Sequence, residues 1–436
     1  MVGTPDEVTP LKDKVSSSGR ATSGSLSKFL SNYWLFITVL LFLISLLTHQ
    51  VPLLLVALLF FLTGGVAKLW ERYCLTRVEY QRRLSANRAF FGDEVQLEIE
   101  IGNRKPLPLP WIQIEDEVPS EVTLLKGKAS PGYPDNRLFL SNLFSLGWYH
   151  RVKRRYPMRC LQRGYFTFGP THIRSGDLFG IYNRELEVKQ VNHLMVYPKI
   201  VPLEKLGIPS NQPVGDIRTR RHIFEDPILT LGVRDYHFGD SLKRIHWKTT
   251  ARLGQLQTKV FEPTTTTDMG IFLDVRTTPS PLWGSIPPLL ELAIMAAASI
   301  ASYALKSRYR VGLYVNQYQR LVNEPVRIPP SQHTDQLRHI LEALAQIHPL
   351  EAMPIARFVQ NESRSLTWGS TMVVISAIPT DALLSTLVRI KRGGRRVVLI
   401  VVGDSKPSIS QDGLTVYHIR EDVAWHEMET LSIKGA

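Results

Sequence analysis

Two apolar runs lie near the N-terminus of the chain. Residues 33–47 and 51–67 contain no charged side chain, and only the polar residues 48–50 separate them. A helix that crosses a bilayer needs roughly 17 to 25 apolar residues. The two runs are at the short end of that range, but they predict a tight transmembrane helical hairpin over residues 31–70. Two buried helices of a soluble core are the alternative.

Basic residues flank the two runs on both sides, whereas the short connection has none. By the positive-inside rule, both ends of the hairpin then face the cytoplasm. The sequence therefore predicts a multi-pass protein of the cell membrane with both termini and the soluble domains in the cytoplasm. Trp34 and Trp70 are expected to be interfacial anchors at the outer ends of the pair. Residues 1–30, which are rich in small and polar side chains, are expected to form a disordered tail. The basic residues are Lys12, Lys14, Arg20 and Lys28 before the pair, and Lys68, Arg72, Arg77, Arg82 and Arg83 after it.

From residue 78 the pattern changes to alternation with a period of two. Val95, Leu97, Ile99 and Ile101 fall on one face of a predicted strand, and polar residues fall between them. Further short strand-like runs follow, each bounded by glycine or proline. Many short alternating strands predict an immunoglobulin-like β-sandwich over residues 76–200, a fold that serves more often as a spacer or binding module than as an enzyme.

A strand, helix, strand rhythm begins near residue 265. Such alternation predicts a doubly wound, mainly parallel α/β domain over residues 265–436, with ligands expected at the C-terminal ends of its strands. Residues 201–230 contain several prolines and are expected to be a linker. The predicted strands lie near 269–275, 310–315, 372–376, 396–402 and 415–419, and the predicted helices near 289–306, 334–347 and 381–391.

Charge and cysteine content narrow the choice of function. The chain has 52 Lys and Arg against 39 Asp and Glu, an excess of 13. One basic cluster lies in residues 150–174, which hold no carboxylate, and a second in residues 216–252. Such clusters form solvated faces or bind anions. The two cysteines, Cys74 and Cys160, have the spacing of neither a disulfide framework nor a zinc site.

The densest polar stretch is residues 231–262. It combines Arg, Asp, His, Trp and Lys without an apolar run long enough to form a core. One interpretation is a buried polar network that joins two domains, since buried charges must be paired. Another is a recognition surface for an acidic or phosphorylated partner. The candidate residues are Arg234, Asp235, Tyr236, Gly239, Asp240, Arg244, His246, Trp247, Lys248 and Arg252, with His237 and Lys243 adding to the positive charge.

The run R-D-Y-H-F-G-D-S-L-K-R-I-H-W-K-T-T-A-R, residues 234–252, resembles the signature of domain-of-unknown-function family number 58. The earlier run R-C-L-Q-R-G-Y-F-T-F-G-P…S-G-D-L-F-G, residues 159–180, is similar to a second block of that family. The resemblance implies a bacterial membrane-anchored protein, often encoded beside MoxR-type AAA+ ATPases. It also implies that the α/β domain is similar to a von Willebrand factor type A domain.

Domains of the von Willebrand type often hold Mg²⁺ in an Asp-x-Ser-x-Ser loop, because a hard cation prefers carboxylate and hydroxyl ligands. The matching positions here are Asp274, Arg276 and Thr278. Arg276 places a positive charge where the cation would bind. We therefore expect no cofactor and no metal, with Asp274 and Thr278 as weak Mg²⁺ candidates, and a capped strand end or an Asp274–Arg276 pair instead.

Three functions remain open from the sequence. The first is a non-enzymatic membrane adaptor that binds a protein partner, with a MoxR-type AAA+ ATPase implied by the resemblance, in complex assembly or envelope homeostasis. The second is an anion or nucleic-acid binding module that uses the basic clusters, although no nucleic-acid-binding motif accompanies them. The third is a hydrolase that uses His246 with Asp235 or Asp240. No phosphate-binding GxxxxGK[ST], HExxH or GxSxG motif occurs, which favours the first.

Overall fold

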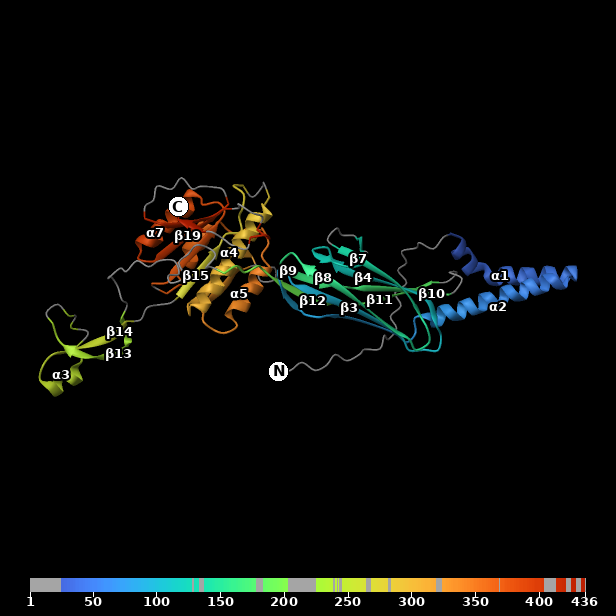
Figure 1. The fold of residues 1–436 in the computed structure, drawn as a ribbon, viewed down its shortest axis with the longest axis horizontal. Helices are drawn as coiled ribbons and strands as arrows, with labels where there is room; N and C mark the ends of the chain where they lie inside the picture. The colour runs from blue at the N-terminus through green and yellow to red at the C-terminus, as the bar shows by residue number, and fades with distance from the viewer. Residues whose placement is uncertain are drawn as a thin grey trace. The chain divides into compact units, whose positions relative to one another are not determined.

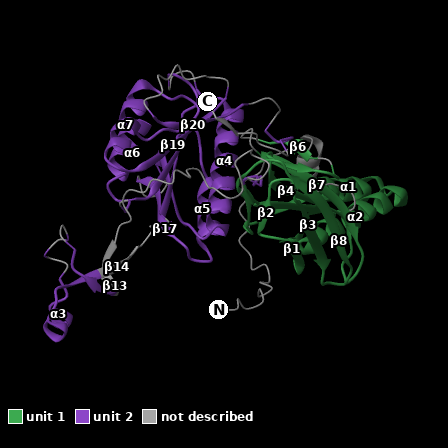
Figure 2. Cartoon of the chain, turned by 60° about the vertical axis from the view of Figure 1, so that its left-hand side comes forward, with its two compact units in different colours: residues 1–197 green, residues 198–436 purple. Residues whose placement is uncertain are grey.

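In the computed structural model the chain divides into two compact units, residues 1–197 and 198–436 (Figure 2). Each unit is described by itself. The structure describes residues 25–127, 129–132, 137–177, 183–202, 225–237, 240, 242, 245–263, 268–280, 284–318, 324–367, 369–403, 413–420, 425–428 and 433–435. The greater part of the predicted tail and linker lies outside them.

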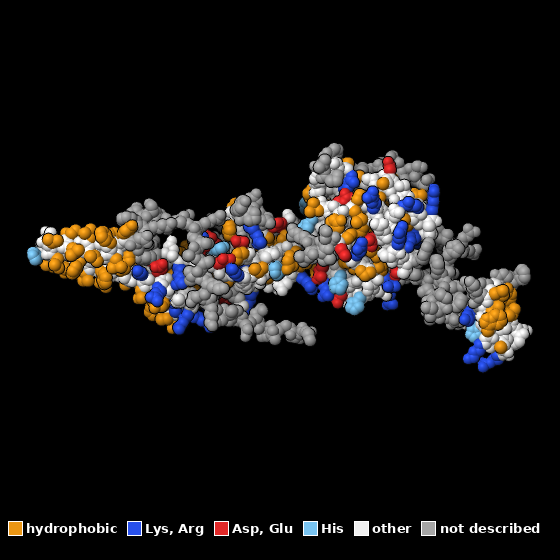
Figure 3. Space-filling model, turned by 180° about the vertical axis from the view of Figure 1, so that it is seen from behind, with side chains coloured by type: hydrophobic (Ala, Val, Ile, Leu, Met, Phe, Trp, Pro, Cys, Tyr) orange, Lys and Arg blue, Asp and Glu red, His pale blue; other side chains and the backbone are white. Residues whose placement is uncertain are grey.

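The N-terminal helices α1 (Ser25–Thr48) and α2 (Val51–Cys74) pack against each other along their length (Figure 1). Their contact is close at Gly64, where an added Cβ would lie 2.5 Å from the Trp34 ring. The other faces of both helices expose apolar side chains, which cover the surface of the pair in Figure 3. Both helices are longer than predicted: α1 begins six residues before 31, and α2 continues past residue 70 into the fold that follows.

Two helices in the described part of the chain are long and apolar enough to span a membrane, α2 and α4 (Pro287–Lys306). Burial separates them, because 72% of the apolar window of α4 is buried inside the protein and only 17% of that of α2. α4 is therefore the core helix of a domain. The exposed apolar surface of α2 is the feature that fits a lipid environment.

Residues 78–197 form three small β-sheets, and two hydrophobic clusters lie between them. The sheets have the strand orders β1-β3-β8-β5, β11-β10-β4-β7-β6 and β2-β12-β9. This confirms a sandwich-like, sheet-rich region, and Val95, Leu97, Ile99 and Ile101 are all buried as the alternation predicts. The strands are β1 (Val78–Leu84), β2 (Arg88–Phe90), β3 (Glu94–Asn103), β4 (Leu109–Pro119), β5 (Val122–Leu124), β6 (Ala129–Pro131), β7 (Arg137–Leu146), β8 (Arg151–Cys160), β9 (Gly164–Phe168), β10 (Thr171–Gly176), β11 (Asn183–Val188) and β12 (Asn192–Tyr197).

A buried ion pair lies inside this sandwich. Arg82 and Asp116 are both fully buried, and their side chains approach to 3.2 Å. Arg82 also donates to the carbonyl oxygen of Phe168 at 2.8 Å and to Oδ1 of Asn192 at 3.0 Å, while Thr171 donates to Asp116 at 2.7 Å. Arg82 is thus a structural residue. The sequence places Arg82 among the basic residues that follow the hairpin, but it does not show that the strand turns this position inward.

The second unit contains a seven-stranded sheet in the order β17-β16-β15-β18-β19-β20-β21. Its five central strands are parallel, and β17 and β21 add antiparallel edges. With β15 counted first, the parallel strands follow the doubly wound order 2-1-3-4-5. Figure 2 shows α4 and α5 on one side of the sheet and α6 and α7 on the other. The elements are β15 (Asp268–Leu273), β16 (Arg310–Tyr318), β17 (Pro325–Ser331), α5 (Gln336–Ala345), α6 (Ile355–Glu362), β18 (Thr371–Ser376), α7 (Asp381–Arg392), β19 (Arg396–Val402), β20 (Thr415–Ile419) and β21 (Ile433–Gly435).

Candidate functional site

The signature stretch folds into a small unit of its own, which we call the signature arm: β13 (Glu225–Asp235), α3 (Trp247–Leu253) and β14 (Gln257–Pro263). β13 and β14 pair antiparallel, and α3 lies between them in sequence (Figure 1). Gly254 ends α3 in the left-handed conformation, with φ of 69°, which glycine adopts without steric cost. β13 begins within the residues predicted to be linker.

Asp240 is the centre of the polar contacts in the arm. Its carboxylate accepts hydrogen bonds from Nη2 of Arg234 at 2.8 Å, the backbone N–H of His237 at 3.0 Å and Oγ1 of Thr258 at 3.3 Å. The hydrogen bond from Arg234, followed by that from the His237 backbone, lowers the pKa of Asp240 to about 2. These bonds tie the loop after β13 to β14 across the arm.

A second set of bonds fixes the other end of the loop. Nε2 of Gln257 donates to Oδ1 of Asp235 at 2.5 Å, and the hydroxyl of Tyr236 donates to the carbonyl oxygen of Asp240 at 3.3 Å. Gln257 and Thr258 are buried, and sequence analysis missed both. The strand alternation that begins at Leu256 was the available signal, since it predicts that some residues of β14 face inward.

His246 caps the N-terminus of α3. Its Nδ1 accepts the backbone N–H of Thr249 at 3.1 Å, as an N-cap side chain does. In the described structure, Asp235 bonds Gln257 and Asp240 bonds Arg234, so these carboxylates orient other groups. The described bonds of these three residues do not join His246 to either carboxylate, so they do not support the hydrolase hypothesis.

The outer surface of the arm is apolar with a basic border. None of the residues of α3 is buried, and Trp247 is 67% exposed. Lys248 and Arg252 are also exposed on this helix. Figure 3 shows this grouping of hydrophobic and basic side chains. We call it the docking face; it consists of Val233, Leu242, Trp247, Lys248, Arg252, Leu253 and Leu256.

The structure therefore divides the predicted site residues into two groups. Arg234, Asp235, Tyr236 and Asp240 form the internal bonds of the arm, while Trp247, Lys248 and Arg252 belong to the docking face. His246 connects the two as the helix cap. Gly239, Lys243 and Arg244 lie outside the described residues.

The first basic cluster is largely engaged in ion pairs between neighbouring strands of the same sheet. These pairs lower the net positive charge that a polyanion would meet on this surface. Arg218, Arg220 and Arg221 of the second cluster lie outside the described residues. The pairs are Arg151 with Glu100, Lys153 and Arg155 with Glu98, and Arg174 with Glu185.

A second candidate site lies at the C-terminal end of β15. Asp274 is buried, and its carboxylate accepts Oγ of Ser376 at 2.8 Å and Nδ2 of Asn316 at 2.9 Å. Burial raises the pKa of Asp274 to about 6. The position is the switch point of the doubly wound sheet, where ligands bind in related architectures.

The loop around Asp274 is closed by its own hydrogen bonds. The backbone N–H of Arg276 donates to Oδ1 of Asp274 at 3.2 Å, which is the expected capped strand end. The guanidinium of Arg276 donates to the carbonyl oxygens of Thr278 and Pro279. The hydroxyl of Thr278 donates to the carbonyl oxygen of Gly284 at 2.7 Å. Among the described residues, no three His, Cys, Asp or Glu side chains are grouped to hold a metal ion.

Part of the chain matches a known family model. Residues 232–430 match the family model described as "Protein of unknown function DUF58". The match spans the signature arm from Gly232 and most of the α/β domain. A relative, the uncharacterized protein YeaD of Bacillus subtilis (strain 168), is 25% identical over 357 residues, which cover 79% of this chain and 81% of the relative.

The solved structures similar to part of the chain include a CARDB domain and a cohesin module. The similarity to the CARDB domain of a Pyrococcus furiosus protein covers 27% of this chain and 89% of the chain of that structure, at 11% identity and a TM-score of 0.17. The similarity to a cohesin module from a Clostridium perfringens family 33 glycoside hydrolase covers 27% of this chain and 96% of the chain of that structure, at 10% identity and a TM-score of 0.21. At these scores the similarity carries no argument about function.

Proposed function

We propose that this protein is a membrane-anchored, non-enzymatic adaptor of the cytoplasm whose docking face binds a protein partner. In this proposal the α1–α2 hairpin spans the cell membrane with both ends inside, and the soluble domains that follow it in the chain lie in the cytoplasm. The apolar exposure of α2 and the basic residues beside the hairpin support the anchoring and its orientation.

The observation that carries the docking role is the exposure of α3. A helix of seven residues is too short to be stable in water by itself, and α3 has no buried residue that would stabilise it by packing. Instead, the His246 cap, the Gly254 terminus and the hydrogen bond from the backbone N–H of Gln257 to Oγ1 of Thr250 at 3.0 Å hold it in place. A fixed backbone that presents an exposed tryptophan beside Lys and Arg has the composition of an interface hot spot.

We further propose that the α/β domain is of the von Willebrand factor type A kind and that the partner is a MoxR-type AAA+ ATPase, acting in complex assembly or envelope homeostasis. The support is the resemblance of the signature run together with the family match over residues 232–430.

Quantitative cross-linking with mass spectrometry on native membranes tests the proposal. The variant is Trp247→Ala with Arg252→Glu, both on the docking face. The control is Leu125→Ala, which replaces a 46% exposed apolar residue of the sandwich. We expect the variant to remain in the membrane and to lose its cross-links to the ATPase, while the control keeps them.

Two results would contradict the docking role. If the variant keeps every cross-link to the ATPase, the docking face is not the binding site. If the variant instead loses cross-links between Lys248 and the rest of its own chain, the arm packs within the protein, and partner binding must be sought elsewhere.

A further inference from the structure

The turn between β7 and β8 exposes two large aromatic side chains. Trp148 and Tyr149 are each 69% exposed. Tyr149 has φ of 49°, a conformation that residues other than glycine adopt uncommonly. Such a backbone persists only where its surroundings fix it.

Hydrogen bonds from the neighbouring chain do fix this turn. The buried side chain of Asn103 donates a hydrogen bond to the carbonyl oxygen of Gly147 at 2.9 Å. The backbone N–H of Asn103 donates a second one to the carbonyl oxygen of His150, also at 2.9 Å. The backbone N–H of Tyr149 donates to the carbonyl oxygen of Lys105 at 3.4 Å. The backbone is thus held in place while both aromatic rings project outward.

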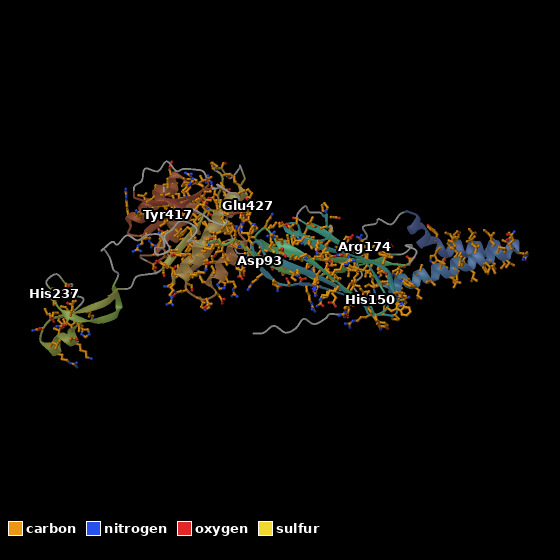
Figure 4. All side chains as sticks on the ribbon, in the orientation of Figure 1. Asp93, His150, Arg174, His237, Tyr417 and Glu427 are labelled. Atoms are coloured by element: carbon orange, nitrogen blue, oxygen red, sulfur yellow. The ribbon has the colours of Figure 1, made fainter. Side chains whose placement is uncertain are left out.

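The same residues connect the turn to the end of α2. The ammonium group of Lys105 is buried and donates to the carbonyl oxygens of Cys74 and Thr76, the latter at 2.8 Å. Cys74 is the last residue of α2 and belongs to the sandwich core. Figure 4 shows His150 at the end of the sandwich from which α2 leaves, and Asp93 at the opposite end.

Basic side chains surround the aromatic turn at this end. Glu79 and Glu100 offset part of the charge through ion pairs, Arg104 with Glu79 at 2.7 Å and Arg151 with Glu100 at 2.8 Å. We call this surface the membrane-proximal rim; its exposed residues are Arg72, Tyr73, Arg77, Arg104, Trp148, Tyr149, His150 and Arg151.

The position of the rim along α2 matches the headgroup layer of a bilayer. Lys68 is the first charged residue of α2 after its apolar part. Cys74 follows six residues later, which at about 1.5 Å per residue is about 9 Å along the helix. The polar layer on one side of a bilayer is roughly 5 to 8 Å thick, so Cys74 lies at about the outer edge of the headgroup layer.

The tryptophans expected to be interfacial anchors do not occupy this surface. Trp34 is 9% exposed and packs between the two helices beside Gly64 and Phe61. Trp70 packs against the hydrophobic cluster of the sandwich. Besides Tyr73 of α2, the exposed aromatic residues at this level come from a turn about eighty residues later in the chain.

We propose that the membrane-proximal rim binds the headgroup region of an anionic bilayer, with Trp148 and Tyr149 inserted at the interface and the arginines facing lipid phosphates. This inference rests on the proposed anchoring by α1 and α2. Tryptophan and tyrosine favour the interface for their amphipathic rings, and clustered Arg side chains are attracted to anionic lipids. The contact would fix the orientation of the sandwich relative to the membrane.

Fluorescent labelling in nanodiscs tests the rim. Cys74 and Cys160 are both buried, so a thiol dye reacts at a single introduced cysteine. The test position is Trp148→Cys. The control is Arg159→Cys on the same sandwich, eight residues along β8 from Arg151 and thus about 26 Å from the rim. A third label, Leu59→Cys at a 63% exposed position of α2, reports on membrane insertion.

Nanodiscs are made from phosphatidylcholine with or without phosphatidylglycerol. They carry lipids with a nitroxide at the headgroup or in the acyl chain, which quenches the fluorescence of a dye at the same depth. We expect headgroup quenching at position 148 to exceed that at position 159 at least about twofold, and to increase with phosphatidylglycerol. Arg77→Gln with Arg104→Gln should reduce that increase.

The three labels separate the possible failures. If the acyl-chain nitroxide quenches the dye at position 59, but the headgroup nitroxide quenches the dyes at positions 148 and 159 equally, anchoring holds and the rim contact is refuted. If phosphatidylglycerol has no effect at position 148, the role of the arginines is refuted. If position 59 is not quenched, both the anchoring and the rim contact are refuted.

Discussion

The ammonium group of Lys105 donates a hydrogen bond to the carbonyl oxygen of Thr76 over 2.8 Å and a second one to the carbonyl oxygen of Cys74. The last carbonyl groups of a helix have no partner within the helix, and a lysine side chain is one of the groups that satisfies them. Burial lowers the pKa of Lys105 to about 8, so the group is still charged at neutral pH. This contact joins the end of α2 to the sandwich.

Replacing Lys105 should weaken that junction. Lys105→Met removes the donor and leaves buried carbonyl oxygens unsatisfied, so we expect the free energy of unfolding of the sandwich to fall by about 1 to 3 kcal/mol. Urea unfolding in detergent measures the change. Lys126→Met, at an exposed position, is the control. Equal stability of the two variants would contradict a structural role for the contact.

The buried pair of Arg82 and Asp116 should be sensitive to loss of one partner. Arg82→Met leaves Asp116 buried without its opposite charge, which typically lowers stability by about 3 to 5 kcal/mol. Arg83→Met changes an exposed neighbour and should alter stability by less than about 0.5 kcal/mol. Thermal unfolding of both variants compares them. An Arg82→Met protein as stable as Arg83→Met would show that the pair contributes little.

Asp274 should make the stability of the α/β domain depend on pH. Its pKa is raised by burial to about 6, so between pH 4 and 6 the folded protein binds more protons than the unfolded chain. Its contribution to stability is therefore greatest below pH 4 and decreases as pH rises through 6, by about 3 kcal/mol in total.

Comparison with Asp274→Asn isolates this effect. The variant has no titrating group at this position, so its free energy of unfolding should lack this decrease between pH 4 and pH 7. Urea unfolding at both values gives the difference. Parallel pH profiles for the two proteins would refute the assigned pKa of Asp274.

Asp240 should titrate at unusually low pH. The hydrogen bonds from Arg234 and the His237 backbone stabilise its carboxylate and lower its pKa to about 2, so the bonds that hold the arm are kept until the pH falls below the ordinary carboxyl range. NMR titration of the Asp240 side-chain carbon measures this value. In Arg234→Ala the pKa should rise toward the ordinary value near 4. An unchanged pKa in that variant would show that Arg234 is not the main cause.

The local pattern of hydrophobic and polar residues predicted the helices and strands that have a recognisable periodicity of their own. The period-two alternation around Val95 identified a strand with one buried face, because successive side chains of a strand point to opposite sides. The apolar runs identified α1 and α2, and the strand and helix rhythm identified a mainly parallel sheet. Their ends were less accurate, since α2 continues to Cys74 only because the sandwich packs against that last turn.

Roles that depend on contacts distant in sequence were not predictable. Arg82 had the sequence context of a surface charge, and only its approach to Asp116 and Phe168 shows that it is buried. The signature run gave the residues of the arm, but not the division between internal bonds at Asp240 and the exposed face at Trp247. That division depends on Gln257 and Thr258 of β14, which the pairing with β13 brings next to Asp235 and Asp240.

By itself, the sequence determined the order of the parts: an apolar pair of helices, a sheet-rich region, a charged signature and an α/β domain. Each of these follows from periodicities that act within a few residues. The tertiary structure alone decided which charged and aromatic side chains face outward, placing Trp34 inside the helix pair and Trp148 on the surface. Burial is a property of the packed chain, because it is set by what the rest of the fold places against each residue.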